Sequence, residues 1–446
     1  MDSILIENIR IVDNPESNLE PSKAGYICLE NGLISNISME ANHAPKSLKQ
    51  SVKVNIDGEG GVVLPGIHNA HVHTEQVLME GIGDGLNLSE WLSGGIRHLT
   101  NSMTGDDMFF ATLCAFARYV SEGVTSIAIH QKNCVNSALC DAVIAAAKTL
   151  GIRIFLFRGW RDQGTSGEQA ECAIKDIERI RKVYENNVDV KVGLAIPSHW
   201  NCSPPGLRTI SDAVNNLKIP IQIHVSETAD ELKQCRNDYE MTPIFKMDKF
   251  NLITNNTELI HCTCLTEEDI DLIAMRDASV IHCPGSNFSL RCGIAPVRQL
   301  INKGVNVSLG TDGAAGWRSS SMLMEAVYAS IASRMLAQEK NPVLVTEATQ
   351  LAWTTRARHI WSPNGKMNLF VGSPGDVTLF KKMESAFRHT IGGKVFSAAS
   401  FPQVKTVICQ GKLVMNDGLF TGLDINDLAD NLTSVRKKLM KELERE

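Results

Sequence analysis

Two histidines spaced two residues apart are the first side chains in this sequence that could do chemistry together. His71 and His73 lie in the segment GIHNAHVHTEQ, residues 66–76. Side chains on a β-strand alternate between its two faces, so these two imidazoles would share a face that His68 does not. We predict that His71 and His73 form half of a metal site, and that His68, beside Asn69, packs or supports it. For the pair alone, two ordinary polar residues near a turn are an equal alternative.

Three further histidines and an aspartate end short apolar segments later in the chain. They are His224 in QIHVSE, His261 in LIHC, His282 in VIHCP and Asp312 in LGTD. Barrel enzymes keep their chemistry at the carboxyl ends of the strands. Three neutral imidazoles and one carboxylate suit Zn²⁺ and leave a position for water. We therefore predict one divalent metal ion, with Zn²⁺ favoured, on four residues: His71, His73, His224 and Asp312.

Glu227 follows His224 by three residues, just past the end of the expected strand. A carboxylate beside a metal-activated water can accept the proton of that water and deliver it to the substrate. We predict this proton-shuttle role for Glu227. The alternative is an acid at the start of a helix that has Ser226 as its N-cap. His130 ends another strand, and its position is compatible with either a pocket-lining or a structural role.

Eight apolar, β-branched segments have to position these side chains. Amphipathic segments of helical length, such as ALCDAVIAAAKTLG, separate them, and several end at glycine, as helices often do. Eight such alternations between residues 62 and 365 predict an α/β fold, a TIM-like (β/α)₈ barrel. The expected strands cover residues 62–73, 124–130, 153–159, 190–196, 220–225, 259–262, 279–284 and 305–312.

Both ends of the chain have a different pattern from the barrel. Residues 1–61 and 366–423 contain short alternating segments punctuated by Gly, Asn and Asp, which is typical of antiparallel sheet. We predict that both ends build one flanking β-sandwich domain. Residues 424–446, DINDLADNLTSVRKKLMKELERE, predict a terminal amphipathic helix whose charges form a solvated face.

Composition excludes several classes of partner. The 446 residues carry a net charge of −6, so a basic surface for nucleic acid or an anionic membrane is not expected. No apolar segment has the length of a membrane span, and the N-terminus resembles a strand more than a signal peptide. The twelve cysteines include no C-x-x-C pair, which favours reduced thiols in a cytoplasm. Cys262 and Cys264 are expected to be small buried residues.

Several segments together resemble the amidohydrolase superfamily: LPGIHNAHVH, IHVSET, LIHC, VIHCPGSNFSL, GIAP, GVNVSLGTDGA and GDVTLF. The resemblance covers nearly the whole chain. It is closest to the mononuclear aminohydrolases, namely the S-adenosylhomocysteine and 5′-methylthioadenosine deaminases, with guanine deaminases and triazine hydrolases as relatives. It implies one divalent ion, usually zinc and sometimes iron or manganese. Binuclear branches need a carbamylated lysine at the end of strand four, whereas Lys191 lies at the start of that segment.

The resemblance also implies roles for individual residues. His261 would polarise the ring or the attacking water, Glu227 would move the proton, and Asp312 would bind metal and help to protonate the leaving group. Substrate contacts are implied for Glu90, which would contact ribose, and for Trp91, Arg158, His199 and His282; Gln76 is added from its place just after the first strand.

Some matches to the family are partial. His199 falls one position later than the histidine of the family, and the second arginine of the S-adenosylhomocysteine deaminases has no counterpart in DQGTSGEQAE, where Arg161 is a substitute. His282 would bind the ring or orient Asp312, and Asn287 would brace its loop. Three histidines outside the pattern are expected to be structural: His43, His359 and His389.

The function expected from these residues is hydrolytic deamination. The favoured substrate is an adenosine derivative such as 5′-methylthioadenosine or S-adenosylhomocysteine, and water is the second reactant. A guanine, 8-oxoguanine, pterin or cytosine deaminase, or a triazine hydrolase, would use the same ligands and the same addition–elimination chemistry. A non-catalytic scaffold on this fold is the remaining alternative, and it is disfavoured because every ligand is present. Assembly into a homo-oligomer is left open.

Overall fold

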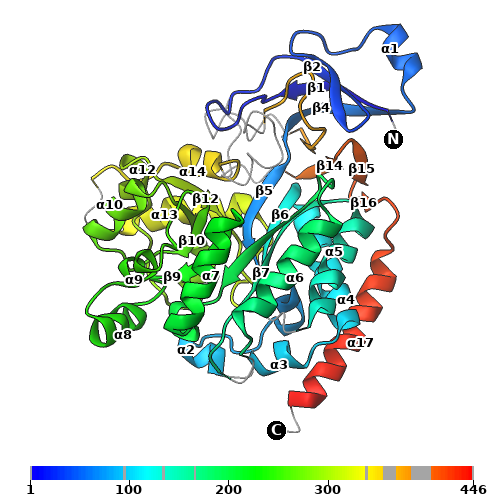
Figure 1. Ribbon diagram of the computed structural model, residues 1–446. Coiled ribbons are helices and arrows are strands. Elements are labelled where there is room, and N and C mark those ends of the chain that lie inside the picture. Colours follow the sequence, from blue (N-terminus) through cyan, green and yellow to red (C-terminus); the bar gives the residue numbers. More distant parts are fainter. Residues whose placement is uncertain are drawn as a thin grey trace.

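Two eight-stranded sheets organise the chain in the computed structural model, which describes residues 3–93, 97–132, 136–164, 167–336, 340–354, 368–382 and 403–443. One sheet forms a barrel surrounded by helices, and the other forms a smaller domain at one end of it (Figure 1). His359 and His389 lie outside the described residues, as does the expected barrel boundary at residue 365.

The barrel sheet is parallel throughout, and its strands neighbour one another in chain order. The ring closes where the segment after the last strand meets the first strand, because the Asp312 N–H donates to the His71 carbonyl at 3.0 Å. Gly310 permits this approach, since a Cβ there would lie 2.8 Å from the His71 Cβ. The predicted (β/α)₈ barrel is confirmed. Its strands are β5 (Ile67–Val72), β6 (Val124–Gln131), β7 (Arg153–Gly159), β8 (Val190–Ile196), β9 (Ile221–Val225), β10 (Thr257–His261), β11 (Ser279–His282) and β12 (Asn306–Leu309).

The segment 62–73, expected as one barrel strand, is two strands. β4 (Val54–Pro65) ends in the terminal sheet, where residues 62–65 pair with β13 (Val377–Phe380), and β5 begins only at Ile67. Gly66 lies between them with no room for a side chain, since a Cβ would lie 2.1 Å from Thr125 Oγ1. The domain boundary proposed after residue 61 stays a prediction, and this pairing favours Gly66.

Helices cover the outer face of the barrel, and their apolar faces join the strands in one large core. Capping explains several helix starts: Thr104 and Asp107 form a reciprocal capping box at the first long helix, and Thr228, not Ser226, caps the helix after Glu227. The helices after β5 to β12 include α4 (Gly105–Ser121), α5 (Ser137–Leu150), α6 (Ala170–Val183), α7 (Pro204–Asn216), α8 (Ala229–Tyr239), α9 (Pro243–Lys249), α10 (Glu267–Met275), α12 (Val297–Asn302), α13 (Met322–Met335) and α14 (Val345–Leu351).

Short helical segments line the carboxyl-end rim of the barrel. They connect a strand end to a long helix, or follow a strand directly, and so carry residues that face the barrel mouth. They are η1 (Thr74–Met79), α2 (Leu88–Trp91), α3 (Arg97–Ser102), η3 (His199–Asn201) and α11 (Pro284–Ser289).

Both chain ends build the second sheet, as predicted. The described strands form one mixed sheet in the order β16-β15-β14-β13-β4-β1-β2-β3, with α1 (Lys46–Ser51) beside it. The sheet has its own apolar cluster, which includes Ile6, Ile27 and Leu379. The remaining strands are β1 (Ile4–Ile11), β2 (Gly25–Glu30), β3 (Leu33–Ser38), β14 (Val404–Cys409), β15 (Lys412–Asn416) and β16 (Leu419–Phe420).

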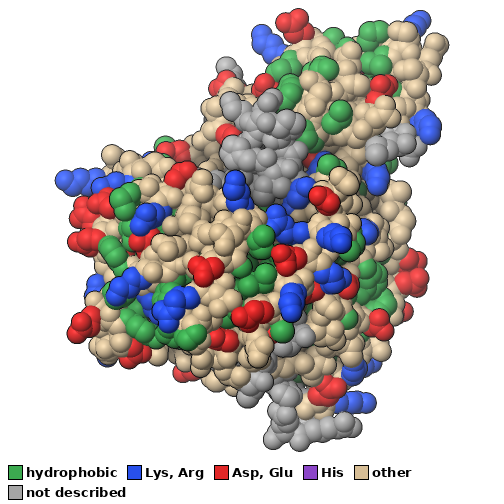
Figure 2. All heavy atoms as spheres, in the orientation of Figure 1, with side chains coloured by type: hydrophobic (Ala, Val, Ile, Leu, Met, Phe, Trp, Pro, Cys, Tyr) green, Lys and Arg blue, Asp and Glu red, His purple; other side chains and the backbone are tan. Residues whose placement is uncertain are grey.

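The terminal helix α17 (Ile425–Leu443) lies along the barrel beside α3 and α4 (Figure 1). Leu428 and Leu439 are buried in the barrel core, and Lys438 Nζ lies 2.7 Å from Asp107 Oδ2. Acidic and basic side chains are interspersed over the face seen in Figure 2. Within the described ranges, no helix combines the length and apolar character needed to cross a membrane, and none of the eleven cysteines there forms a disulfide.

Candidate metal centre and active-site pocket

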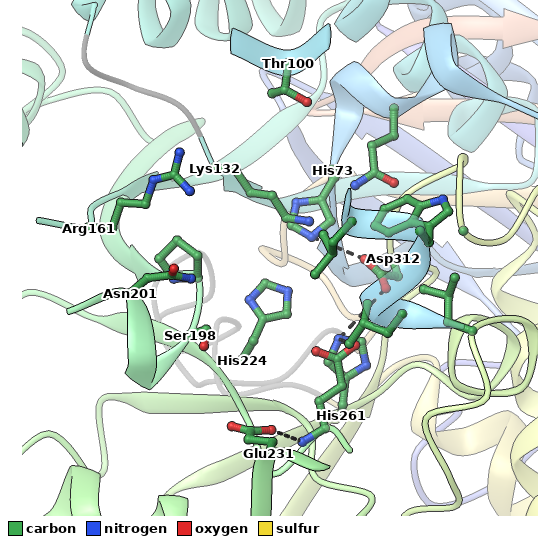
Figure 3. A pocket seen from close by; sticks show the side chains of 18 of the residues that line it. His73, Thr100, Lys132, Arg161, Ser198, Asn201, His224, Glu231, His261 and Asp312 are labelled. Atoms are coloured by element: carbon green, nitrogen blue, oxygen red, sulfur yellow. Dashed lines mark hydrogen bonds and ion pairs between the residues drawn. The ribbon is translucent and has the colours of Figure 1, made fainter. Parts of the chain in front are cut away.

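Four buried side chains converge at the carboxyl ends of the barrel strands. His71 ends β5 and His73 follows it, His224 lies in β9, and Asp312 lies just beyond β12. Their nearest ligand atoms all lie within 4.8 Å of one another. Asp312 Oδ1 is 3.4 Å from His71 Nε2 and 3.3 Å from His73 Nε2 (Figure 3). Residues more than 200 positions apart in the sequence therefore form one cluster of potential metal ligands.

Hydrogen bonds around the cluster fix the protonation of two imidazoles. His73 Nδ1 lies 2.7 Å from the His130 carbonyl oxygen, so it must carry the proton. His71 Nδ1 lies 3.2 Å from Gln222 Oε1, and the Gln222 amide nitrogen donates to the Ala70 carbonyl and to Glu258. Oε1 is therefore an acceptor, and His71 Nδ1 donates to it. Among the described residues, neither Nε2 atom has a hydrogen-bond partner.

The donor set fits a divalent metal ion. Burial holds the pKa of His73 and that of His224 well below the ordinary value, so both rings are neutral and offer a lone pair. Burial alone would raise the pKa of Asp312, but the imidazoles of His71, His73 and His261 beside its carboxylate hold it well below its usual range. Three imidazoles with buried Nε2 or Nδ1 atoms that have no hydrogen-bond partner among the described residues, beside a carboxylate, are the ligands that zinc and related ions prefer.

Asp312 is held in place by its neighbours on both carboxylate oxygens. The Ser286 hydroxyl donates to Oδ2 at 2.6 Å, and the Gly313 N–H donates to Oδ1 at 2.8 Å. The backbone of Asp312 is in the left-handed region, with φ of +60°. Such a conformation is uncommon for a residue with a side chain and is retained where the surrounding structure fixes it.

Glu227 and His261 lie beside the metal cluster. Glu227 Oε1 is 3.4 Å from His261 Nε2, which in turn is 3.9 Å from Asp312 Oδ2. His261 Nδ1 lies 2.8 Å from Asn287 Oδ1, so Asn287 orients the ring itself rather than only bracing its loop. Strand alternation would send His261 toward the helices with its register partner Val225, but a φ of +71° at His261 breaks that alternation.

An open pocket lies directly over this cluster and encloses about 950 Å³, including the part open to solvent. His73, His224, Glu227, His261 and Asp312 form its floor, as Figure 3 shows for four of them. Two predicted substrate-binding residues, Trp91 and Gln76, line it. The other lining side chains are Leu88, Leu92, Thr100, Asn101, Lys132, Arg161, Pro197, Ser198, Trp200, Asn201, Glu231 and Leu290.

Arg158, predicted to bind substrate, has other partners. In β7, Phe155 and Phe157 belong to a cluster with residues of neighbouring strands, while Ile154 and Leu156 join the helix-side core. Arg158 shares the parity of the latter pair and points outward. Its guanidinium lies 2.7 Å from Glu168 and 3.3 Å from Asp176 of α6. The placement corrects the prediction: Arg158 is a buried structural cation, and Arg161 is the arginine that lines the pocket.

Glu90, expected to contact ribose, does not line the pocket either. It is exposed at the third position of α2, and its carboxylate accepts the Asn87 N–H at 3.1 Å in a capping box. This placement does not support a substrate contact for Glu90. The alternative role, an acid at the start of a helix, describes what the structure shows.

Three other predicted histidines lie behind the pocket wall. His199 is buried and contacts Lys246 and Glu231. His282 is buried next to His261, and burial lowers its pKa to about 3. His130 packs against the metal cluster, with its ring centroid 4.2 Å from that of His224. Of these three, none is among the pocket-lining residues that the structure describes.

His68 and His43 stay away from the pocket floor. His68 Nδ1 lies 2.8 Å from Ser126 Oγ, which suits a supporting position. The register of β5 against β6 shifts between Asn69 and Val72, so a simple alternation count does not extend along this strand. His43 pairs with Glu7 in the terminal sheet.

Sequence reasoning missed several residues of the pocket wall. Lys132 directly follows β6, and Trp200 and Asn201 belong to the short helix η3 after β8, where no period or motif marks them. A usable signal existed for Lys132, which follows the strand-ending His130 by two residues. A second signal existed for Gln222. It is a glutamine within the apolar strand IQIHV, and because it lies two residues before His224, it shares the strand face of His224.

A parallel (β/α)₈ barrel with a three-histidine, one-aspartate cluster and a glutamate at the strand ends defines a metal-dependent hydrolase of the barrel class. The model of the amidohydrolase family matches residues 62–414, and the chain belongs to this family. It is a hydrolase acting on carbon–nitrogen bonds other than peptide bonds, and its cluster of three histidines and one aspartate is suited to a divalent metal ion.

Curated relatives and solved structures cover almost the same length. The chain is 29% identical over 368 residues to a 5′-deoxyadenosine deaminase of Methanothermobacter thermautotrophicus, covering 81% of this chain and 84% of the relative. It is 28% identical over 443 residues to a 5-methylthioadenosine/S-adenosylhomocysteine deaminase of Syntrophomonas wolfei, covering 98% and 99%. A zinc-bound adenosine deaminase structure from Xanthomonas campestris superposes with a TM-score of 0.86 at 21% identity, covering 98% of both chains.

Proposed function

We propose that this protein is a hydrolytic deaminase that releases ammonia from the exocyclic amine of an adenosine derivative, such as 5′-methylthioadenosine or S-adenosylhomocysteine. The observation that carries the proposal is the Glu227 carboxylate at 3.4 Å from His261, beside the four potential metal ligands and under an open pocket. The substrate class is supported by the names of the relatives.

The metal supplies one part of the chemistry. A single divalent ion, with Zn²⁺ favoured and Fe²⁺ or Mn²⁺ as alternatives, would be held by His71, His73, His224 and Asp312, and would lower the pKa of water toward neutrality. Lys191 does not supply a carbamylated lysine for a second ion. It lies at the start of β8, and its Nζ donates to the Asn187 carbonyl.

The residues of the chain manage the protons. Glu227 accepts a proton from the attacking water and delivers it to the ring nitrogen next to the carbon that bears the amine. A carbon–oxygen bond forms at that carbon as the ring nitrogen is protonated. His261, oriented by Asn287, would polarise the attacking water, and Asp312 would move the second proton of that water from the new hydroxyl group to the amine. The carbon–nitrogen bond then breaks, ammonia leaves, and a ring carbonyl remains.

The pocket walls suit a flat heterocycle with a polar substituent. Trp91, Leu88 and Leu290 supply apolar surface, whereas Thr100, Asn101, Ser198 and Asn201 supply hydrogen-bonding groups. Two cations, Lys132 and Arg161, also line the pocket, on the side away from Glu231 in Figure 3. A cytoplasmic location, as well as a homo-oligomeric assembly, stays a prediction from the sequence.

The experiment is a screen for ammonia release by the metal-loaded protein. It should include adenosine derivatives, guanine, 8-oxoguanine, cytosine, pterins and aminotriazines. Turnover of an adenosine derivative is expected, and the absence of turnover with every amine-bearing ring would contradict the deaminase proposal. Glu227→Gln should lower kcat by about 10²–10⁴-fold with the metal retained. The matched control is Asp230→Asn, an exposed acid in the first turn of α8.

A further inference from the structure

A buried row of three ionisable residues lies behind Glu227. Glu231 begins α8, His199 belongs to η3, and Lys246 lies in α9. The exposed fraction is 3% for Glu231, 1% for His199 and 2% for Lys246, so all three side chains are shielded from solvent. Glu231 also borders the active-site pocket (Figure 3). Charged groups are rarely buried without a partner, and each of these has to be accounted for.

The direction of each hydrogen bond follows from Lys246. Its ammonium group has donors only, and Nζ lies 3.2 Å from His199 Nδ1 and 3.3 Å from the His199 carbonyl oxygen. His199 Nδ1 is therefore the acceptor. Burial and the neighbouring Lys246 lower the pKa of His199 to about 3, so the ring is neutral and its single proton is on Nε2.

The His199 proton faces Glu231. Nε2 lies 3.4 Å from Glu231 Oε1, and the other carboxylate oxygen, Oε2, accepts the backbone N–H of Glu227 at 2.6 Å. Glu231 thus has the His199 ring in contact with one carboxyl oxygen and the Glu227 N–H hydrogen-bonded to the other. Among the described residues, no carboxylate comes within ion-pair distance of Lys246, and burial raises the pKa of Glu231 to about 8. The Lys246 ammonium instead contacts the Tyr239 ring, at 3.8 Å from its centroid, and the His199 ring.

The same contacts hold the backbone that carries the proton shuttle. Ser226 is in the left-handed region with φ of +51°, a conformation that needs support from its surroundings. Its carbonyl accepts the Cys264 N–H at 2.9 Å, and the Glu227 carbonyl accepts the Thr263 hydroxyl at 2.7 Å. The Glu227 N–H belongs to the same turn, and Glu231 Oε2 accepts its hydrogen bond.

We infer that Lys246, His199 and Glu231 form a positioning chain that fixes the backbone of Glu227, and thereby aims its carboxylate at His261 and the substrate. The inference rests on the proposed deaminase function for its kinetic consequence only. These three are positioning residues, since they act through Glu227. The role differs from the substrate contact expected for His199, whose ring atoms are committed to Lys246 and Glu231.

The sharpest test is Lys246→Met. Methionine fills a similar volume without charge. Because removing one member of a buried charged group can destabilise a protein, circular dichroism and thermal unfolding are used to check that the variant is folded. Loss of the lysine allows His199 to move its proton to Nδ1, which leaves two acceptors, His199 Nε2 and Glu231 Oε1, facing each other. We expect kcat to fall about tenfold or more, with KM changed less than about threefold and metal content unchanged. Lys249→Met, an exposed lysine of the same helix, is the matched control.

Glu231→Gln tests the other end of the chain. The amide replaces one of the two carboxyl oxygens by an NH₂ group, so a donor then faces either the Glu227 N–H or the His199 ring. Amide hydrogen exchange of the peptide that contains Glu227 should become faster in both Glu231→Gln and Lys246→Met, and should be unchanged in Lys249→Met. This readout does not depend on any substrate.

The outcomes separate the two proposals. A wild-type protein that deaminates an adenosine derivative, together with a Lys246→Met variant that retains kcat within about twofold, overturns the positioning chain. A wild-type protein that releases no ammonia overturns the proposed function, and exchange at Glu227 then decides the inference alone: faster exchange in both variants supports it, and unchanged exchange overturns it.

Discussion

The metal centre and the substrate wall of the pocket are built differently. The potential ligands His71, His73 and His224 stand on or directly after strands of one parallel sheet, and their partners Gln222 and His130 belong to strands of the same sheet. The substrate wall comes from segments between strands and helices, such as those that carry Lys132, Arg161 and Trp200. The comparison indicates that the reaction is determined by the scaffold, whereas the substrate is selected by loops.

Removing a metal ligand should have the largest effect. Asp312→Ala removes the carboxylate that faces the imidazoles of His71 and His73. The same carboxylate lies 3.9 Å from His261 Nε2. We expect the metal to be lost and kcat/KM to fall by about 10³-fold or more. Metal analysis and ammonia release measure this. His43→Ala, a surface histidine of the terminal sheet, is the control, and a normally active Asp312→Ala would contradict the assignment.

A change one layer behind the ligands should cost less. Gln222→Leu removes the oxygen that accepts the His71 Nδ1 proton, and leucine is similar in size to glutamine. Partners of this kind typically contribute about 10–100-fold in metal affinity. Competition with a chelator measures that affinity. Unchanged affinity would mean that the scaffold fixes His71 without Gln222.

The substrate wall should respond selectively. Lys132 lines the pocket with its Nζ 5.8 Å from the Trp91 ring centroid. A charge-assisted hydrogen bond contributes about 1.5–3 kcal/mol, so Lys132→Met should raise KM about tenfold or more for a derivative that carries a carboxylate. For a neutral derivative such as 5′-methylthioadenosine, KM should stay within about threefold. An equal change for both substrates would remove Lys132 from substrate selection.

The smallest effect on activity is expected behind Asp312, where stability should change instead. Glu325 is buried and accepts the Gly285 N–H at 2.9 Å, next to the Ser286 that binds Asp312. Burial raises the pKa of Glu325 to about 8.

The sign of the pH effect follows from that raised pKa. Between about pH 4.5 and 8 the folded state holds a proton on Glu325 that the unfolded state releases, so stability falls as pH rises through this window, by roughly 5 kcal/mol at most. Glu325→Gln should flatten this part of the pH dependence. Chemical denaturation at pH 5 and pH 8 measures it, and an unchanged slope in the variant would contradict the raised pKa.

Much of the metal site was predictable because its residues share one geometric rule. His224 and Asp312 each end a short apolar segment, and parallel strands bring such ends to one rim. The rule fails where the backbone departs from regular strand geometry. His261 faces the pocket through a left-handed backbone, and β5 shifts its register beside His71, which no count of alternating positions anticipates.

The sequence by itself determined the barrel, the sheet built from both ends and which four residues converge as potential metal ligands, because hydrophobic periodicity and strand-end chemistry are local properties. The tertiary structure alone decided which arginine reaches the pocket. It committed Arg158 to an ion pair with Glu168 and Asp176, and placed Arg161 at the wall. It also decided which nitrogen of each imidazole is free for a metal, since that choice depends on partners such as Gln222, contributed by distant strands and known only once the barrel closes.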